Sequence, residues 1–147
     1  MSNCPPPCPG RRRGFDFGNH FNEYAGFECD YSRYPSPQQQ HLFFRHYLAA
    51  GACRNQPTGS GSGGDDQEEA RTCSDPSPLM LERMEAEANL FALASHIYWG
   101  VWALIQARYS PIDFDYLQYS GTRWGEYHRR KDGFVAQARR VLLAGKH

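Results

Sequence analysis

Two tryptophans stand three residues apart in a long apolar stretch, and their spacing is the first sign of chemistry in this sequence. Trp99 and Trp102 would share one face of a helix, because residues i and i+3 are neighbours on a helical surface. An aromatic-rich stretch with Phe114, Tyr116 and Tyr119 follows them. Aromatic faces attract ammonium groups, so two such walls could enclose a small organic cation. A stripe of aromatic residues is also typical of a hydrophobic core, and the spacing alone leaves both interpretations open.

A long helix would position the two tryptophans. Apolar residues recur at steps of three or four and cover most of the second half of Leu79–Tyr109, which predicts a helix buried within a larger lobe. Gly100 lies between the tryptophans and weakens this helix by about 1 kcal/mol relative to alanine. A close approach by a ligand or by another backbone would explain it. Pro111 ends the helix, and a further helix is expected over Asp113–Tyr127.

The sequence predicts less regular structure for the N-terminal part of the chain. Residues 1–13 are rich in proline and arginine and cannot form a packed element. Phe15–Ala25 looks like a loop that enters a helix. Gln38–Ala50 has apolar residues near helical spacing, with Ser36 as a plausible N-cap and Gly51 at the expected end of the helix.

A linker and a tail flank the last predicted helices. The range Gly51–Pro78 combines a Gly/Ser run with acidic residues and has almost no large apolar side chain. Burial there cannot offset the entropy of ordering, so we expect a disordered linker. The range 129–147 reads as a basic tail, weakly amphipathic over Phe134–Leu143.

The composition excludes several classes of protein. With 16 basic and 16 acidic residues the formal net charge is zero, which argues against a nucleic-acid-binding protein. The five cysteines form no CxxC pair, so reduced thiols in a cytoplasmic protein are the default interpretation. No signal peptide is visible, and the apolar run over Asn89–Gln106 is shorter than a membrane span, so no membrane span is expected.

Two ordered blocks of sequence resemble the choline/ethanolamine kinase family. The first block runs Ser95-His96, Trp99 to Trp102, Gln106-Ala107, Ser110-Pro111-Ile112-Asp113-Phe114 and Tyr116 to Tyr119. The second block reads GFDFGNHFNEYAG over residues 14–26. Asn22 and the Tyr-Ala-Gly after Glu23 look more like ethanolamine kinases, the plant type above all, than like choline kinases. The resemblance covers about residues 14–48 and 79–127.

The resemblance implies a mainly α fold, the helical C-terminal part of a protein-kinase-like C-lobe and not a complete kinase domain. Residues 14–50 and 79–128 would form this helical portion. Residues 1–13 would then be an unstructured start, 51–78 a disordered insert and 129–147 the basic tail.

The resemblance also implies which residues hold the substrate, ethanolamine or choline. Carried over motif by motif, the amino-alcohol pocket consists of Glu23, Trp99, Trp102, Phe114, Tyr116 and Tyr119. The carboxylate of Glu23 would pair with the substrate ammonium. A carboxylate on a helix surface is the alternative for Glu23, and hydrogen-bonded structural roles are favoured for His20 and His96.

The family uses ATP and Mg²⁺, but their binding elements are not recognisable in this sequence. Asp16-Phe17-Gly18 spells the magnesium-binding triplet of protein kinases, yet no catalytic loop precedes it, and we expect a structural role for Asp16. No glycine-rich nucleotide loop and no catalytic base stand out either. We therefore assign no catalytic residue and no metal ligand, and we expect the chain alone to be inactive.

Two functions follow as hypotheses. The chain would be the C-terminal portion of an ethanolamine kinase, an enzyme of phosphatidylethanolamine biosynthesis. The alternative is a non-catalytic, pseudokinase-like binding or interaction module that associates with a full-length kinase. Genomic sequence upstream of Gly14 would separate them, because an in-frame exon that encodes the catalytic loop favours the first.

Overall fold

The computed structural model of the chain describes residues 13–54 and 75–143. In these two ranges the elements are α-helices and one 3-10 turn: α1 (Arg13–Glu23), η1 (Tyr31–Arg33), α2 (Pro37–Arg54), α3 (Pro78–Tyr109) and α4 (Tyr116–Leu142). The expectation of a mainly α fold is confirmed.

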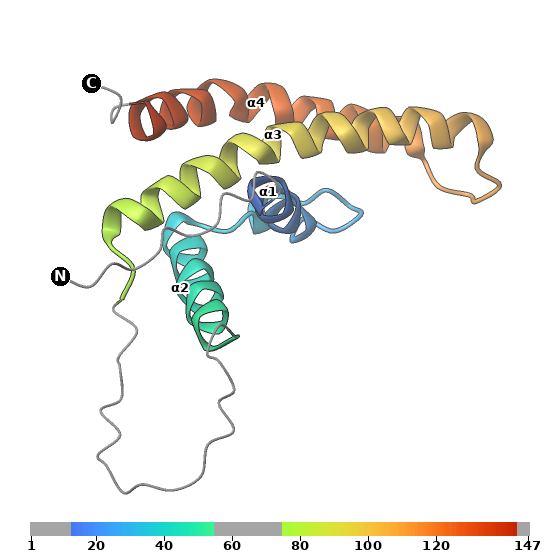
Figure 1. Cartoon of the computed structure of the whole chain (residues 1–147). Coiled ribbons are helices and arrows are strands. Elements are labelled where there is room, and N and C mark those ends of the chain that lie inside the picture. The colour runs from blue at the N-terminus through green and yellow to red at the C-terminus, as the bar shows by residue number, and fades with distance from the viewer. Residues whose placement is uncertain (1–12, 55–74, 144–147) are drawn as a thin grey trace, which may run out of the picture.

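The two longest helices, α3 and α4, form an antiparallel hairpin that spans the molecule (Figure 1). Ser110 caps the C-terminus of α3 just before Pro111, and the side chain of Asp115 caps the N-terminus of α4 by accepting from the Gln118 amide at 2.8 Å. The helices approach closely at Gly100, where the indole of Trp124 on α4 lies 3.0 Å from the position that a Cβ would occupy. A side chain of α4, rather than a ligand or a backbone, therefore explains the glycine between the tryptophans.

Helix α1 lies across α3, and α2 extends away from the N-terminal half of α3 (Figure 1). Gly18 makes the α1–α3 contact: a Cβ there would stand 2.5 Å from the amide nitrogen of Ala92 and 2.6 Å from the carbonyl oxygen of Ala88. The core at this junction comes from three helices and consists of Phe17, Phe21, Phe44, Leu81 and Ala88. Its aromatic rings meet mostly edge to face, as for Phe17 and Phe44 at 5.3 Å.

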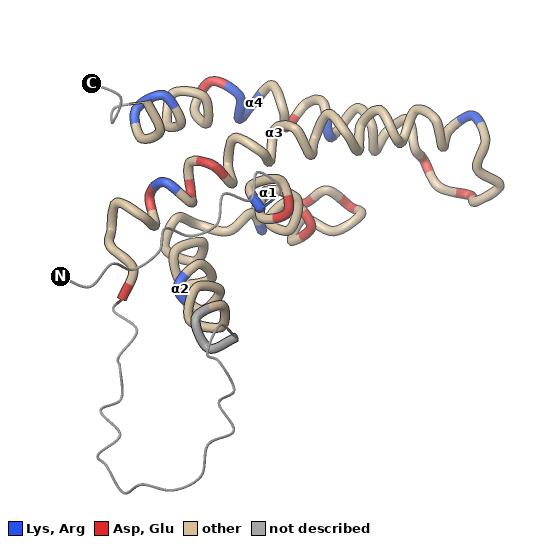
Figure 2. Tube along the Cα trace, in the orientation of Figure 1, with Lys and Arg blue, Asp and Glu red and all other residues tan. Residues whose placement is uncertain are grey.

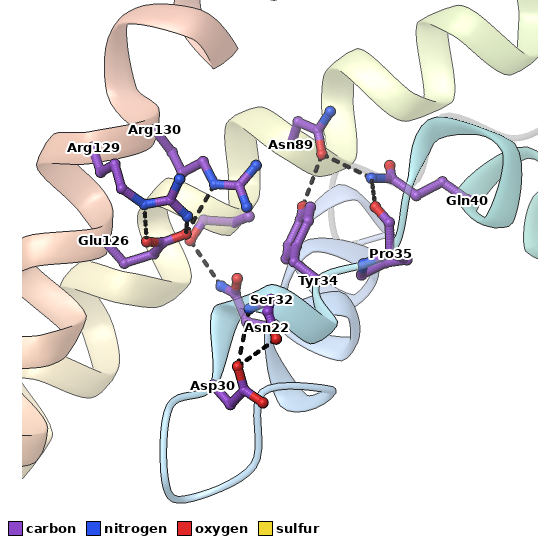
Figure 3. Close-up of polar contacts among 11 residues, drawn as sticks. Asn22, Asp30, Ser32, Tyr34, Pro35, Gln40, Asn89, Glu126, Arg129 and Arg130 are labelled. Atoms are coloured by element: carbon purple, nitrogen blue, oxygen red, sulfur yellow. Dashed lines mark hydrogen bonds and ion pairs between the residues drawn. The ribbon is translucent and has the colours of Figure 1, made fainter.

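A buried asparagine connects α3 to the chain before α2 and to the end of α4. Asn89 accepts hydrogen bonds from Tyr34 Oη at 2.8 Å and from Gln40 Nε2 at 3.3 Å, as Figure 3 shows. Its own amide nitrogen donates to Gln137 Oε1 at 2.9 Å. Gln137 in turn donates to Glu85 at 2.6 Å. Most of the polar groups buried in this part of the molecule thus satisfy one another, and Gln40 Oε1 is the exception within this network.

The end of α4 includes much of the range expected to be a basic tail. Residues 129–142 continue the helix, and Phe134 contacts Tyr34 at a centroid distance of 6.0 Å. Glu126 binds both Arg129 and Arg130 on the same helix (Figure 3). Phe134 and Gln137, which bonds to Asn89 and Glu85 on α3, connect this end of α4 to the rest of the molecule, so it continues the packed hairpin.

Several helix boundaries differ from the sequence-based expectations. Gly51 does not end α2, which continues to Arg54, and α4 begins at Tyr116 rather than Asp113 and extends past Tyr127 to Leu142. The expected cap is present at α2, where Ser36 Oγ accepts from the Gln39 amide at 3.4 Å. Of the two segments expected to be disordered, residues 1–12 and 55–74 lie outside the described residues.

Helix α3 is apolar along much of its length. Over one 18-residue window its mean hydropathy is 1.3, so by length and composition alone it could cross a membrane, and 44% of that window is buried inside the molecule. Charged residues lie on its first turns and are absent from its second half until Arg108 (Figure 2). Burial against α1 and α4 accounts for part of this composition, whereas Ile97, Tyr98, Val101, Leu104 and Ile105 are exposed.

Candidate functional site

One cleft of about 470 Å³ lies where the end of α1, the following turn, the second half of α3 and the first half of α4 meet. Its lining is part aromatic and part polar: Asn22, Glu23, Gly26, Phe27, Trp99, Trp102, Tyr119 and Arg123. The cleft therefore brings together four of the six residues that the sequence predicted for a cation pocket.

The aromatic walls come from α3 and α4. Trp99 and Trp102 pack edge to face, with ring centroids 5.3 Å apart and ring planes at 79°. Tyr119 faces them from the next helix, one turn after its start. Burial raises the pKa of the Tyr119 hydroxyl, so this phenol stays neutral at physiological pH. Such neutral π-faces suit a small cation.

The carboxylate of the cleft belongs to Glu23, the last residue of α1. Its side chain is exposed, and Oε1 accepts a hydrogen bond from Asn19 Nδ2 at 2.7 Å. A negative charge thus stands beside the aromatic faces, where it can pair with an ammonium group.

The other two predicted residues, Phe114 and Tyr116, lie outside the lining of this cleft. Tyr116 is buried behind Trp102, with ring centroids 5.8 Å apart, and its hydroxyl lies 3.1 Å from Ser110 Oγ. Phe114 lines a neighbouring hollow of about 350 Å³ that shares Phe27 and Tyr119 with the cleft. Tyr116 therefore supports the wall from behind, and Phe114 stands at the rim.

Sequence reasoning did not predict Gly26, Phe27 and Arg123 as members of the site. Gly26 has a φ of 65° and turns the chain after α1, which places Phe27 at the mouth of the cleft, 76% exposed. Arg123 is only 3% exposed and donates to Ser95 Oγ at 3.1 Å. Its position four residues after Tyr119 is the one sequence signal, because i and i+4 share a helical face.

Asn22 served in the sequence as a marker of ethanolamine kinases, and it lies in the floor of the cleft. Its amide nitrogen donates to the Ala92 carbonyl at 3.0 Å, which ties the end of α1 to α3 (Figure 3). The side chain is 1% exposed.

His96 lies beneath the cleft as a neutral base. Burial lowers the pKa of His96 to about 3, and the positive charges of Arg123, Arg130 and Arg129 add to the shift. Its ring contacts Tyr31 edge to face at 5.3 Å. His96 directly follows Ser95 and lies about one turn before Trp99 on α3, but it is not part of the cleft lining, so we assign it a structural role.

Lowering the pH from 7 to 5 is expected to destabilise the chain through His96. The unfolded side chain takes up a proton below about pH 6.5, whereas the folded one stays neutral until about pH 3. Unfolding therefore binds a proton in this window, and stability falls as pH falls, by up to about 1.4 kcal/mol per pH unit. Urea unfolding at several pH values measures the slope. His96→Gln should reduce it, and an equal slope in both proteins would contradict the assignment.

The remaining candidates from the sequence lie elsewhere. His20 packs among aromatic rings, with Phe43 at 5.1 Å and Tyr24 at 5.3 Å, as a structural residue would. Asp16 is exposed in the first turn of α1 and does not line the cleft. Across residues 13–54 and 75–143, no group of three or more His, Cys, Asp or Glu side chains is placed to hold a metal ion.

Comparison with known proteins adds an independent observation. The family model for choline/ethanolamine kinase matches residues 8–128, a range that includes every residue of the cleft. The match begins at residue 8, whereas the resemblance read from the sequence begins at Gly14.

Curated relatives and a solved structure agree with this match. A probable ethanolamine kinase of Arabidopsis thaliana is 45% identical over 119 residues, which are 81% of this chain and 26% of that protein. Probable ethanolamine kinase A of Dictyostelium discoideum is 42% identical over 84% of this chain and 30% of its own length. The structure of a Plasmodium vivax ethanolamine kinase superposes with a TM-score of 0.57 and 32% identity, over 85% of this chain and 26% of that one. The chain thus spans about a quarter to just under a third of the length of the relatives it matches.

Proposed function

Because this chain belongs to the choline/ethanolamine kinase family, we propose that its cleft binds the ammonium end of an amino alcohol. The observation that carries the proposal is one cleft with a carboxylate and three aromatic faces: Glu23, Trp99, Trp102 and Tyr119. The aromatic faces contribute about 0.5 to 2 kcal/mol to cation binding. The carboxylate adds a charge-assisted hydrogen bond when the ligand carries an N–H group.

We further propose ethanolamine rather than choline as the ligand. A primary ammonium has three N–H donors for the Glu23 carboxylate, whereas a quaternary ammonium has none. The likeness of Asn22 and the following turn to ethanolamine kinases points the same way. Gly26 and Phe27 of this turn lie at the cleft.

In the kinase reaction, the γ-phosphoryl group of ATP would pass to the substrate hydroxyl. Held at its ammonium end by Glu23 and the indoles, ethanolamine would extend its hydroxyl out of the cleft. Among residues 13–54 and 75–143, no group of three or more His, Cys, Asp or Glu side chains is placed to hold Mg²⁺, and Asp16, two turns before Glu23 on α1, does not line the cleft. We therefore derive no phosphoryl-transfer step from this chain, and we propose that it acts in the cytoplasm as the substrate-binding part of such an enzyme.

Ethanolamine is expected to bind the 147-residue chain saturably with a dissociation constant in the millimolar range, about 4 kcal/mol. Quenching of tryptophan fluorescence measures it, because two indoles line the cleft. Glu23→Gln keeps the side-chain shape, removes the charge and should weaken binding about tenfold. Ethylene glycol, which has no ammonium group, is the matched ligand control. Equal binding of ethanolamine by the parent and Glu23→Gln would refute the assignment.

An ATP-consumption assay separates the two functional hypotheses. The chain alone should show no ethanolamine-dependent turnover. Fusion to the upstream portion of a close relative should give a kinase with a higher specificity constant for ethanolamine than for choline. A chain that binds ethanolamine and gives no activity in any such fusion would instead be a non-catalytic binding module, whose partner would be a full-length kinase.

A further inference from the structure

Asn19 connects the aromatic wall of the cleft to its carboxylate without lining the cleft itself. Its Oδ1 accepts hydrogen bonds from Trp99 Nε1 at 2.6 Å and from Ser95 Oγ at 2.9 Å. Its Nδ2 donates to Glu23 Oε1 at 2.7 Å. One amide thus contacts the indole on α3 and the carboxylate at the end of α1.

The hydrogen-bonding groups allow only one orientation of this amide. Indole Nε1–H is a donor only, so it must face the amide oxygen of Asn19. An ionised carboxylate is an acceptor only, so Glu23 must face the amide nitrogen. A flip of the Asn19 side chain would oppose donor to donor and acceptor to acceptor, which fixes the assignment without observed hydrogens.

A second set of contacts anchors Asn19 from α4. The buried guanidinium of Arg123 donates to Ser95 Oγ at 3.1 Å, and the Ser95 hydroxyl donates on to Asn19 Oδ1. The donors therefore run in one direction, from Arg123 through Ser95 and Asn19 to Glu23. Hydrogen bonds aligned in this way polarise and strengthen one another. The chain of bonds crosses from α4 to α3 to α1, the three helices that build the cleft.

We propose that Asn19 is a positioning residue of the cation site, which holds the Trp99 indole and the Glu23 carboxylate in one fixed geometry. This inference rests on the proposed function, since it names a residue that prepares the same site. Without Asn19, the exposed Glu23 side chain and the indole N–H would each lose the hydrogen bond that orients them. Both recognition groups would still be present, but the ligand would have to order them on binding, at a cost in affinity.

Asn19→Ala is expected to weaken ethanolamine binding by about tenfold, with Trp99 and Glu23 both intact. Asn89→Ala is the matched control. Asn89 also makes three side-chain hydrogen bonds, but it lies ten residues, or about 15 Å of helix, before Trp99. Each variant loses an asparagine that makes three side-chain hydrogen bonds, so both variants should have a lower melting temperature. Only Asn19→Ala should raise the dissociation constant for ethanolamine. An equal effect of the two variants on affinity would overturn the inference.

The indole proton gives a readout that needs no ligand. In the NMR spectrum of the parent chain the Trp99 Nε1–H signal, assigned through Trp99→Phe, should be shifted and protected from exchange by its short bond to Asn19. In Asn19→Ala it should move toward the solvent value, while the Trp124 signal keeps its position. An unmoved Trp99 signal would contradict the proposal.

A double-mutant cycle tests whether Asn19 acts through Glu23. In the Glu23→Gln background, Asn19→Ala should cost less than in the parent chain, because the Asn19 amide there donates to a neutral acceptor instead of a charged one. In a second cycle, Trp99→Phe takes the place of Asn19→Ala and is combined with Glu23→Gln. Trp99→Phe keeps an aromatic ring but loses the N–H that donates to Asn19, so this cycle still tests the connection if Asn19→Ala does not fold. Absence of ethanolamine binding by the parent would overturn the proposed function itself, whereas additive losses in both cycles would overturn only the role of Asn19.

Discussion

Gly18→Ala is expected to destabilise the chain by about 3 kcal/mol or more, the upper end of the cost of overpacking a core. The added methyl group would stand 2.5 Å from the Ala92 amide nitrogen and 2.6 Å from the Ala88 carbonyl oxygen. These are backbone atoms of α3, so no side-chain rotation relieves the clash and the two helices must separate. Because α1 carries Asn19 and Glu23, the cleft would be lost with the contact.

A glycine on the open face of α4 is the control for this prediction. At Gly125 no atom lies within 4 Å of the position that a Cβ would occupy, and the residue lies in the interior of a long helix. Gly125→Ala should therefore stabilise the chain by about 0.5 to 1 kcal/mol, through helix propensity alone. Thermal unfolding followed by circular dichroism measures both variants. A melting temperature of Gly18→Ala at or above that of the parent would show that α1 and α3 do not pack as described.

Trp102→Ala is expected to weaken ethanolamine binding by about tenfold, which corresponds to about 1 to 2 kcal/mol for one aromatic face on a cation. Trp102 lines the cleft and packs against both Trp99 and Tyr116. Tyr47→Phe should leave binding unchanged, because Tyr47 lies on α2 against Phe17, at a ring distance of 4.9 Å, and takes no part in the cleft. Isothermal titration with ethanolamine measures both.

Packing loss could imitate this effect, since truncation of a buried tryptophan typically costs about 3 to 5 kcal/mol of stability. Trp102→Phe addresses it by keeping an aromatic face of smaller area, and it should lose less affinity than Trp102→Ala. Melting temperatures measured beside the affinities complete the test. If Trp102→Ala melted earlier but bound ethanolamine as the parent does, Trp102 would be a core residue and the cation site would have to lie elsewhere.

The aromatic stripe could also be hydrophobic core, and the structure separates the side chains of the stripe that are core from those that line the cleft. Tyr116 is buried behind Trp102, as a core residue is, whereas Trp99 and Trp102 are partly exposed at the cleft. The same stripe therefore serves both as core and as wall. The spacing of these residues in the sequence could not separate core from cleft wall, because spacing shows which residues share a helix face but not what packs against that face.

The sequence alone determined the local features of this protein. The ends of α3 follow from Ser77 and Pro78 at its start and Pro111 after its end, since caps and prolines act within one turn. The placement of Trp99 and Trp102 on one face follows from helical geometry. The mainly α fold and the family followed from motifs in a fixed order, and these were confirmed.

Tertiary structure decided what depends on contacts between distant segments. The extension of α2 past Gly51 has a local reason instead, because a single glycine costs only about 1 kcal/mol, too little to end a helix by itself. Helix α4 runs on to Leu142 because its end packs through Gln137 and Phe134 against α3 and Tyr34, contacts between residues about 50 to 100 positions apart.

The same reason explains the parts of the site that sequence reasoning missed. Phe27 reaches the cleft only because Gly26 turns the chain, and Arg123 reaches it only because α4 folds back along α3. Asn19 connects to Trp99 across 80 residues of sequence. Local patterns specify helices and their faces, but the partners of each face are chosen by the packing of α1, α3 and α4 as a unit.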